Sequence, residues 1–136
     1  MSPEAAPVDA LGRLSDWSQW NVAVAGIGIA GYACADALLQ LGARVTVLDS
    51  GDGEGQQRKA EILRALDATV LLGYDGTVPE GAQILVVSPG LRPDAPLIVD
   101  ALRRGIPVWG ELELAWRLRH PESAAAWLCV TGTNGK

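Results

Sequence analysis

Two glycine-rich segments have the residue types and spacing needed to bind phosphate groups. The first is Gly26-Ile27-Gly28-Ile29-Ala30-Gly31, which reads G-x-G-x-x-G and directly follows the apolar run 22–25. In such a segment Gly26 permits a tight turn, Gly28 lets a diphosphate approach the backbone, and Gly31 lets a helix pack closely on the sheet. The free N–H groups at the start of that helix favour negative charge. The motif predicts a site for a diphosphate nucleotide; the alternative is a glycine turn that serves packing only.

The second segment is Thr131-Gly132-Thr133-Asn134-Gly135-Lys136, which follows the apolar run 127–130. This order predicts a buried strand, a turn whose N–H groups wrap phosphates, and a lysine that adds a point charge. The full Walker spacing is absent, because Val130 stands where a glycine would be needed. The expected ligand is ATP or GTP; the alternative is a solvent loop with a chance lysine. No helix opened by Ser or Thr follows to hold magnesium, so we expect the front piece of a longer protein.

Polar residues also follow two other apolar runs. Asp49 lies about 20 residues beyond the glycines, where a Rossmann site places its ribose-binding carboxylate. Asp49 and Ser50 are equally suited to another nucleoside, and Asp49 alone is suited to forming the turn of the loop 51–53. Ser88-Pro89-Gly90 offers a hydroxyl, a rigid turn and exposed backbone N–H groups, although such a turn is also common without function. Since ligands of open α/β sheets lie outside the carboxyl ends of the strands, these residues and the first glycine segment are expected to line one crevice.

The elements that must position these residues alternate along the chain. Five short apolar runs are the expected strands: 22–25, 44–48, 69–72, 84–87 and 106–109. Their apolar residues are nearly continuous, which is typical of parallel strands buried on both faces. Four segments with helical periodicity lie between or after them: 29–41, 57–66, 94–104 and 111–119. The pattern predicts an α/β fold: a Rossmann-like, doubly wound, parallel five-stranded sheet with flanking helices in a single domain.

Length and composition narrow the function classes. A chain of 136 residues allows one domain of ordinary size. We expect an N-terminal extension over 1–20, the Rossmann-like domain over 21–122, and the first strand and truncated phosphate loop of a second domain over 123–136. Sixteen acidic and 11 basic residues give a net charge of −5, which argues against nucleic acid as a partner. Arg103 and Arg104 are interpreted as a solvated helix end.

Targeting signals and metal clusters are not evident. No apolar run approaches the roughly 20 residues of a membrane span, and residues 1–20 do not resemble a signal peptide, so we expect a cytoplasmic protein without membrane insertion. The two cysteines, Cys34 and Cys129, lie in expected buried elements and outside any metal-spaced cluster. They are interpreted as reduced core thiols, and no metal site is expected in this piece.

The order of these motifs resembles the Mur ligase family of peptidoglycan synthesis. The resemblance rests on the first glycine segment, Asp49-Ser50, Ser88-Pro89-Gly90, the stretch Gly110-Glu111-Leu112-Glu113-Leu114 and the terminal loop. It covers about 22–136 and is closest to the members that add D-glutamate. Relatives that add L-alanine typically carry histidine where Asn134 stands. Two nucleotide sites in one chain also favour a ligase or kinase that acts on a nucleotide-linked substrate.

The resemblance implies a three-domain enzyme whose first domain holds the UDP end of UDP-N-acetylmuramoyl-L-alanine. ATP, with Mg²⁺, would phosphorylate the substrate carboxylate, and the amine of D-glutamate would attack the acyl phosphate. Residues that match the family's UDP site are Gly26, Gly28, Ile29, Ala30, Gly31, Asp49, Ser50, Ser88, Pro89 and Gly90. Residues that match the ATP site are Gly132, Thr133, Asn134, Gly135 and Lys136.

Within these matches, Ile29 and Ala30 would approach the UDP, Asp49 and Ser50 would lie near the uracil, and the turn 88–90 would close over the nucleotide. Ala30 departs from the hydroxyl residue often found there, so only its backbone N–H is available. No catalytic residue is expected in this piece, and the chain alone is expected to be inactive. Two other interpretations stay open at this point: an NAD-dependent oxidoreductase domain and a non-catalytic nucleotide sensor.

Overall fold

The computed structural model describes residues 7–135, and its centre is a sheet of five parallel strands in the order β3-β2-β1-β4-β5. The strands are β1 (Asn21–Ala25), β2 (Arg44–Leu48), β3 (Thr69–Leu71), β4 (Ile84–Val87) and β5 (Val108–Gly110). This order, in which the chain moves outward from the middle in both directions, is that of doubly wound folds. The predicted α/β class, the parallel sheet and its five strands are confirmed.

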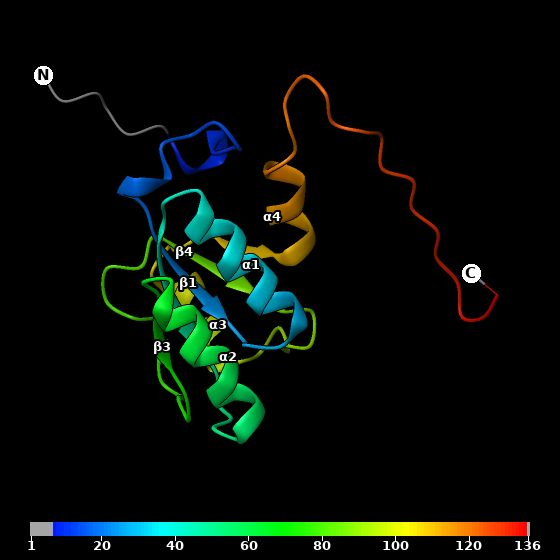
Figure 1. Cartoon of the computed structure of the whole chain (residues 1–136). Helices are drawn as coiled ribbons and strands as arrows, with labels where there is room; N and C mark the ends of the chain where they lie inside the picture. The colour runs from blue at the N-terminus through cyan, green and yellow to red at the C-terminus, as the bar shows by residue number, and fades with distance from the viewer. Residues whose placement is uncertain (1–6, 136) are drawn as a thin grey trace, which may run out of the picture.

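Four helices cover the two faces of this sheet: α1 (Ile29–Gln40), α2 (Glu54–Ala65), α3 (Pro96–Arg103) and α4 (Glu111–Arg117). Successive side chains of β1 point to opposite faces of the sheet. Val22 and Val24 join the large core cluster that includes residues of α1, α2 and α4, whereas Ala23 and Ala25 join a smaller cluster with Ala101 of α3. Figure 1 shows α1 and α2 side by side over the sheet. Because both faces are covered, the central strands β1 and β4 are almost entirely apolar and buried.

One connection departs from the strand–helix alternation. Residues 72–83 link β3 to β4 without a helix. Parallel strands need a crossover, and a helix is the usual one. Here the irregular segment supplies Val78 to the smaller core cluster, where its side chain is 1% exposed. This face of the sheet is therefore closed by α3 and by an irregular loop.

The expected N-terminal extension contributes to the core. It forms two short 3₁₀ helices, η1 (Val8–Ala10) and η2 (Trp17–Gln19). Leu11 is 3% exposed, and Trp17 is fully buried with its ring edge-on to Trp109 of β5 at 6.5 Å between centroids. The segment 11–20 is thus part of the folded domain, because Leu11, Trp17 and Trp20 belong to the large core cluster.

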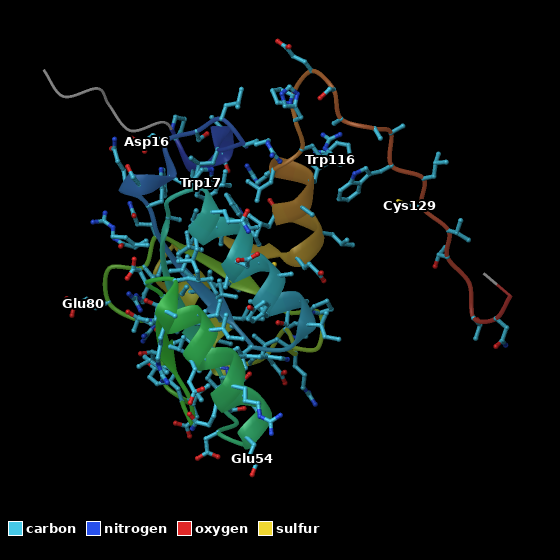
Figure 2. The ribbon with its side chains drawn as sticks, in the orientation of Figure 1. Asp16, Trp17, Glu54, Glu80, Trp116 and Cys129 are labelled. Atoms are coloured by element: carbon cyan, nitrogen blue, oxygen red, sulfur yellow. The ribbon has the colours of Figure 1, made fainter. Side chains whose placement is uncertain are left out.

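The strand expected at Trp127–Val130 does not form, and that prediction was wrong. Residues 124–135 adopt neither helix nor strand, and Leu128 is 92% exposed. Figure 1 shows this tail leaving α4 and running away from the sheet, so no neighbouring strand pairs with its backbone. Cys129, labelled in Figure 2, is exposed and not in a core, whereas Cys34 is buried as predicted. Lys136 lies outside the described residues.

Candidate functional site

A crevice of about 330 Å³ opens at the carboxyl ends of the central strands. Residues from three strand ends line it, and sequence analysis singled out five of them: Gly26, Asp49, Ser50, Ser88 and Gly90. These residues are up to 64 positions apart in the chain, and the register of β1 with β2 and β4 brings them together. The other predicted residues, Gly28, Ile29, Ala30, Gly31 and Pro89, belong to the same turns but do not line this cavity.

The turn from β1 to α1 is built on close backbone approaches that only glycine allows. Gly26 has φ +101°, and a Cβ added there would lie 2.6 Å from the Ser88 Oγ. A Cβ on Gly31 would lie 1.8 Å from the carbonyl oxygen of Gly26. The Ser88 hydroxyl donates to the Ala25 carbonyl at 2.9 Å, which ties the β4 turn to the end of β1. Packing therefore accounts for two of the three motif glycines.

Gly28 has no such packing role. It is the N-cap of α1, its φ is −63°, and a Cβ added there would meet no atom within 4 Å. No side chain caps this helix end, and the first N–H groups of a helix have no partner within the helix. The next residue does not cover this helix start, since Ile29 is 89% exposed. The helix start thus presents donors and positive dipole to unfilled space, which suits an anion.

Asp49 anchors the loops on both sides of the crevice. Its Oδ2 accepts a hydrogen bond from the Ile27 N–H at 2.8 Å, and its Oδ1 accepts one from the Gly51 N–H at 2.8 Å. The turn-forming role considered for Asp49 is therefore present. A carboxylate has about four lone-pair sites, so two acceptor positions remain for a ligand.

Lys59 of α2 supplies a positive charge beside the glycine turn, and sequence analysis did not single it out. Its Nζ donates to the Ile27 carbonyl at 3.2 Å. Both backbone polar groups of Ile27 are therefore held by charged side chains: its N–H by the Asp49 carboxylate and its C=O by the Lys59 ammonium. In a chain of net charge −5, this ammonium offsets part of the repulsion that an anionic ligand would meet.

The crevice has a second set of walls that sequence analysis also missed. One wall is Tyr74, Asp75 and Gly76, which follow β3. The other is apolar and comes from the β4–α3 turn and the first residues of α3: Leu91, Ala95, Pro96 and Leu97. The rule that places ligands at carboxyl ends of strands would have found the first wall, because 74–76 follow the third expected strand as Asp49 and Ser50 follow the second.

The predicted ATP-site residues are not part of this crevice. Gly132, Thr133, Asn134 and Gly135 are exposed in the tail, and Gly135 has φ +70°. Among residues 7–135, no three His, Cys, Asp or Glu side chains are placed to hold a metal ion. A larger hollow of about 580 Å³ lies between residues 10–15 and 116–124, but none of the predicted phosphate-binding residues lines it.

The strand order, the glycine turn after β1 and the crevice at the strand ends are those of a Rossmann-like α/β domain. Residues 20–110 match the family model described as Mur ligase MurD-like, N-terminal domain. The chain therefore belongs to this family of Mur ligase N-terminal domains.

Curated relatives with the name UDP-N-acetylmuramoylalanine–D-glutamate ligase agree with the family model. One from Streptomyces avermitilis is 51% identical over 123 residues, which are 90% of this chain and 26% of the relative. One from Frankia casuarinae is 52% identical over 120 residues, which are 88% of this chain and 25% of the relative. The chain thus spans about a quarter of the length of these relatives. The oxidoreductase and sensor interpretations gain no support from them. In the part of the chain that the structure describes, no helix has the length and apolar character to cross a bilayer.

Proposed function

We propose that this chain is the UDP-substrate-binding domain of an ATP-dependent ligase that adds D-glutamate to UDP-N-acetylmuramoyl-L-alanine in peptidoglycan synthesis. The observation that carries the proposal is the unfilled space at Gly28, next to a crevice that unites Gly26, Asp49, Ser50, Ser88 and Gly90. A diphosphate would accept from the amides at the start of α1, and the nucleoside would enter the crevice. The names of the relatives supply the substrate class.

In this proposal each turn has a separate task. The N–H groups of Gly28, Ile29 and Ala30 bind the diphosphate, and the Lys59 ammonium neutralises part of its charge. Asp49 and Ser50 accept from and donate to the uracil. The turn Ser88-Pro89-Gly90 closes over the nucleotide, with Ser88 held in place by the Ala25 carbonyl. These residues bind and orient; the acyl-phosphate chemistry belongs to other parts of the longer enzyme.

The ATP site is proposed from the sequence and the relatives alone. Gly132 to Gly135 would wrap the phosphates and Lys136 would add its charge, with Mg²⁺ held by other parts of the enzyme. In the described tail these residues are exposed, so they would take their binding conformation with the ATP domain around them. We place the activity in the cytoplasm, where ATP is available, with no nucleic acid partner and no membrane insertion.

Substitution of Gly28 by alanine tests the diphosphate site without disturbing the fold. The backbone angles at Gly28 suit alanine and the new Cβ meets no protein atom, so the melting temperature should stay within about 2 °C. The methyl group would occupy the space of the diphosphate, so the affinity for UDP-N-acetylmuramoyl-L-alanine should fall at least about tenfold. Isothermal titration calorimetry on the 136-residue chain measures this.

The matched control is Gly55→Ala, since Gly55 also lies at a helix start with open space around it but is on α2, away from the crevice. Its affinity should equal that of the unaltered chain. Unchanged binding in Gly28→Ala would refute the placement of the diphosphate, and tighter binding of NAD than of UDP would refute the ligase assignment. In the longer enzyme, ADP release should depend on both D-glutamate and the UDP-linked substrate.

A further inference from the structure

The connection between β3 and β4 reaches the crevice with little packing to hold it. Residues 72–83 contain one fully buried side chain, Val78. Upstream of Val78, the crevice is lined by Tyr74, Asp75 and Gly76. Tyr74 and Gly76 are partly buried, and Asp75 is exposed. A loop with so few apolar contacts needs another source of order, because each residue fixed in place costs about 1–2 kcal/mol of conformational entropy.

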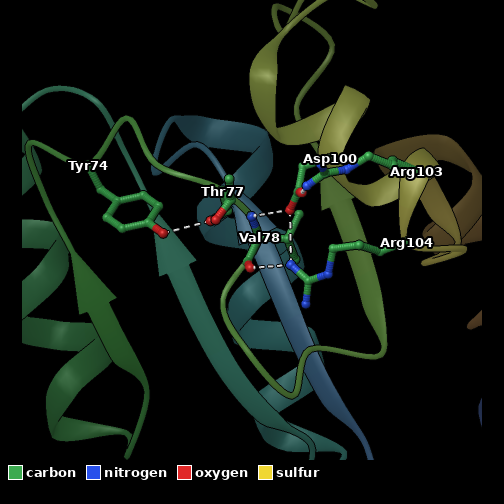
Figure 3. Close-up of polar contacts among 6 residues, drawn as sticks. All are labelled: Tyr74, Thr77, Val78, Asp100, Arg103 and Arg104. Atoms are coloured by element: carbon green, nitrogen blue, oxygen red, sulfur yellow. Dashed lines mark hydrogen bonds and ion pairs between the residues drawn. The ribbon is translucent and has the colours of Figure 1, made fainter.

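At the upstream end of the segment, the Gly73 N–H donates to the Gly51 carbonyl at 3.2 Å and the Tyr74 N–H donates to the Asp49 carbonyl at 2.9 Å. At Val78 the source of order is a charged pair on α3, drawn in Figure 3. Asp100 is the one charged residue that is buried in the described part of the chain, with 5% of its surface exposed. Its Oδ2 accepts from the Val78 N–H at 3.0 Å and from the Arg104 guanidinium at 2.9 Å. The same guanidinium donates to the Val78 carbonyl at 2.6 Å. One side-chain pair therefore satisfies both backbone polar groups of Val78, as a neighbouring strand would.

Arg103 is a second cation on the Asp100 carboxylate, and its hydrogen bond goes to Asp100 and not to Val78. It donates to the Asp100 Oδ1 at 2.8 Å, and its side chain is 75% exposed. Together the Arg103 and Arg104 guanidinium groups hold the pKa of Asp100 below its usual value, so the carboxylate is ionised at neutral pH. Arg104 was expected to be a solvated helix end; instead it bonds to a residue 26 positions away.

The order imposed at Val78 extends to the wall of the crevice. The Tyr74 hydroxyl donates to the carbonyl of Thr77, the residue next to Val78, at 2.6 Å. A Cβ on Gly76 would lie 2.7 Å from the Tyr74 ring, so the ring lies directly against the Gly76 backbone. Tyr74 is therefore tied to the loop segment that Asp100 and Arg104 hold.

The opposite wall belongs to the same helix. Pro96 and Leu97, at the start of α3, line the crevice on its apolar side, and Asp100 follows one turn later. Helix α3 thus forms one wall directly and holds the other through its polar pair. Helix α3 therefore acts on both walls, together with the backbone hydrogen bond from the Tyr74 N–H to the Asp49 carbonyl. A slot with an aromatic ring and apolar residues as walls suits a flat heterocycle.

We infer that Asp100 and Arg104 are positioning residues that set the width of the base-binding slot by holding Val78, and through it the Tyr74–Gly76 wall. The inference rests on the proposed nucleotide site. A buried ion pair adds little net stability compared with apolar packing, which fits a role in position better than one in stability. In this inference Asp100 and Arg104 affect which base the slot accepts, and the glycine turn affects the affinity for the diphosphate.

The test compares Arg104→Met with Arg103→Met. Both remove one guanidinium from Asp100, but only Arg104 bonds to Val78. We expect Arg104→Met to weaken UDP binding by about tenfold and to reduce the ratio of UDP to ADP affinity, while Arg103→Met changes each by less than about twofold. Asp100→Asn, which keeps an acceptor for the Val78 N–H, should fall between them. Calorimetry with UDP, with ADP in competition, gives both constants.

Amide hydrogen exchange provides a readout that needs no ligand. In Arg104→Met the N–H groups of residues 74–78 should exchange at least about tenfold faster, with those of β1 unchanged. A merely structural role would lower the melting temperature without changing the UDP-to-ADP ratio. Equal UDP affinity in the two methionine variants, or unchanged exchange at 74–78, overturns the inference. If the unaltered chain does not bind UDP, the proposed function fails, and the exchange data still decide whether the pair holds the loop.

Discussion

The glycine turn after β1 and the connection between β3 and β4 line the same crevice but are held in different ways. In the glycine turn the closest contacts are between backbone atoms, since Gly31 lets α1 pack on the carbonyl of Gly26. The middle of the β3–β4 connection, at Val78, is held by the side chains of Asp100 and Arg104. Contacts of the first kind cannot yield without moving backbone, whereas contacts of the second kind can be altered one at a time. We therefore expect stability to depend on the turn and base selectivity to depend on the connection.

The largest loss of stability is expected for Gly31→Ala, which tests the close packing in the glycine turn. The added Cβ would lie 1.8 Å from a backbone oxygen, so α1 or the turn must shift, and the free energy of unfolding should fall by about 3 kcal/mol or more. Gly55→Ala is the matched control, because Gly55 also lies in the first turn of a helix but meets no atom within 4 Å. It should gain about 0.5–1 kcal/mol. Urea unfolding followed by tryptophan fluorescence measures both, and equal stability in the two variants would contradict the close-packing argument.

A smaller loss is expected for Gly26→Ala. Its φ of +101° is unfavourable for alanine, and the Cβ would lie 2.6 Å from the Ser88 Oγ, so we expect a loss of about 2 kcal/mol. Ser88→Ala removes that oxygen and the hydrogen bond to Ala25. In the Ser88→Ala background the Gly26→Ala loss should therefore shrink by about 0.5–1 kcal/mol. A double-mutant cycle in urea checks this, and strictly additive losses would show that backbone strain alone is responsible.

The same contrast explains how much could be predicted from the sequence. The glycine turn depends on residues within one short segment, and its spacing indicates the strand before it and the helix after it. Asp49, Ser50 and Ser88 were found because they follow apolar runs, and parallel pairing brings strand ends together. These are short-range patterns, and the fold and five of the residues that line the crevice followed from them.

Tyr74, Asp75 and Gly76 also follow a strand, but the side chains that hold their loop in place leave no local pattern. Asp100 and Arg104 resemble surface residues of a helix, and only the fold brings Val78 within reach, 22 and 26 positions away. The run Trp127–Val130 shows the converse error. It has the composition of a buried strand, but strand formation needs a partner, and the structure places none beside it.

Acid titration should separate the polar pair from the rest of the domain. Because Arg103 and Arg104 lower the pKa of Asp100 below 3.8, its unfolded-state value, the ion pair stabilises the fold fully above that pH. The contribution is lost as the pH falls through the depressed folded-state pKa. The difference in unfolding free energy between the unaltered chain and Asp100→Asn should therefore be constant near neutral pH and decrease below about pH 4. A difference that stays constant to pH 2 would mean that Asp100 is not paired in solution.

The smallest effect on stability is expected for Gly76→Ala, although the contact resembles that at Gly31. The new Cβ would lie 2.7 Å from the ring of Tyr74, which is the far end of a side chain and can rotate away. The cost is the exposed hydrogen bond from Tyr74 to Thr77, so the free energy of unfolding should change by less than about 1 kcal/mol. Displacement of the ring into or out of the slot should nevertheless weaken UDP binding about fivefold or more. Thermal melts and calorimetry on one preparation measure both, with Gly55→Ala again as the control. A large stability loss with unaltered UDP affinity would reverse the roles assigned to the two regions.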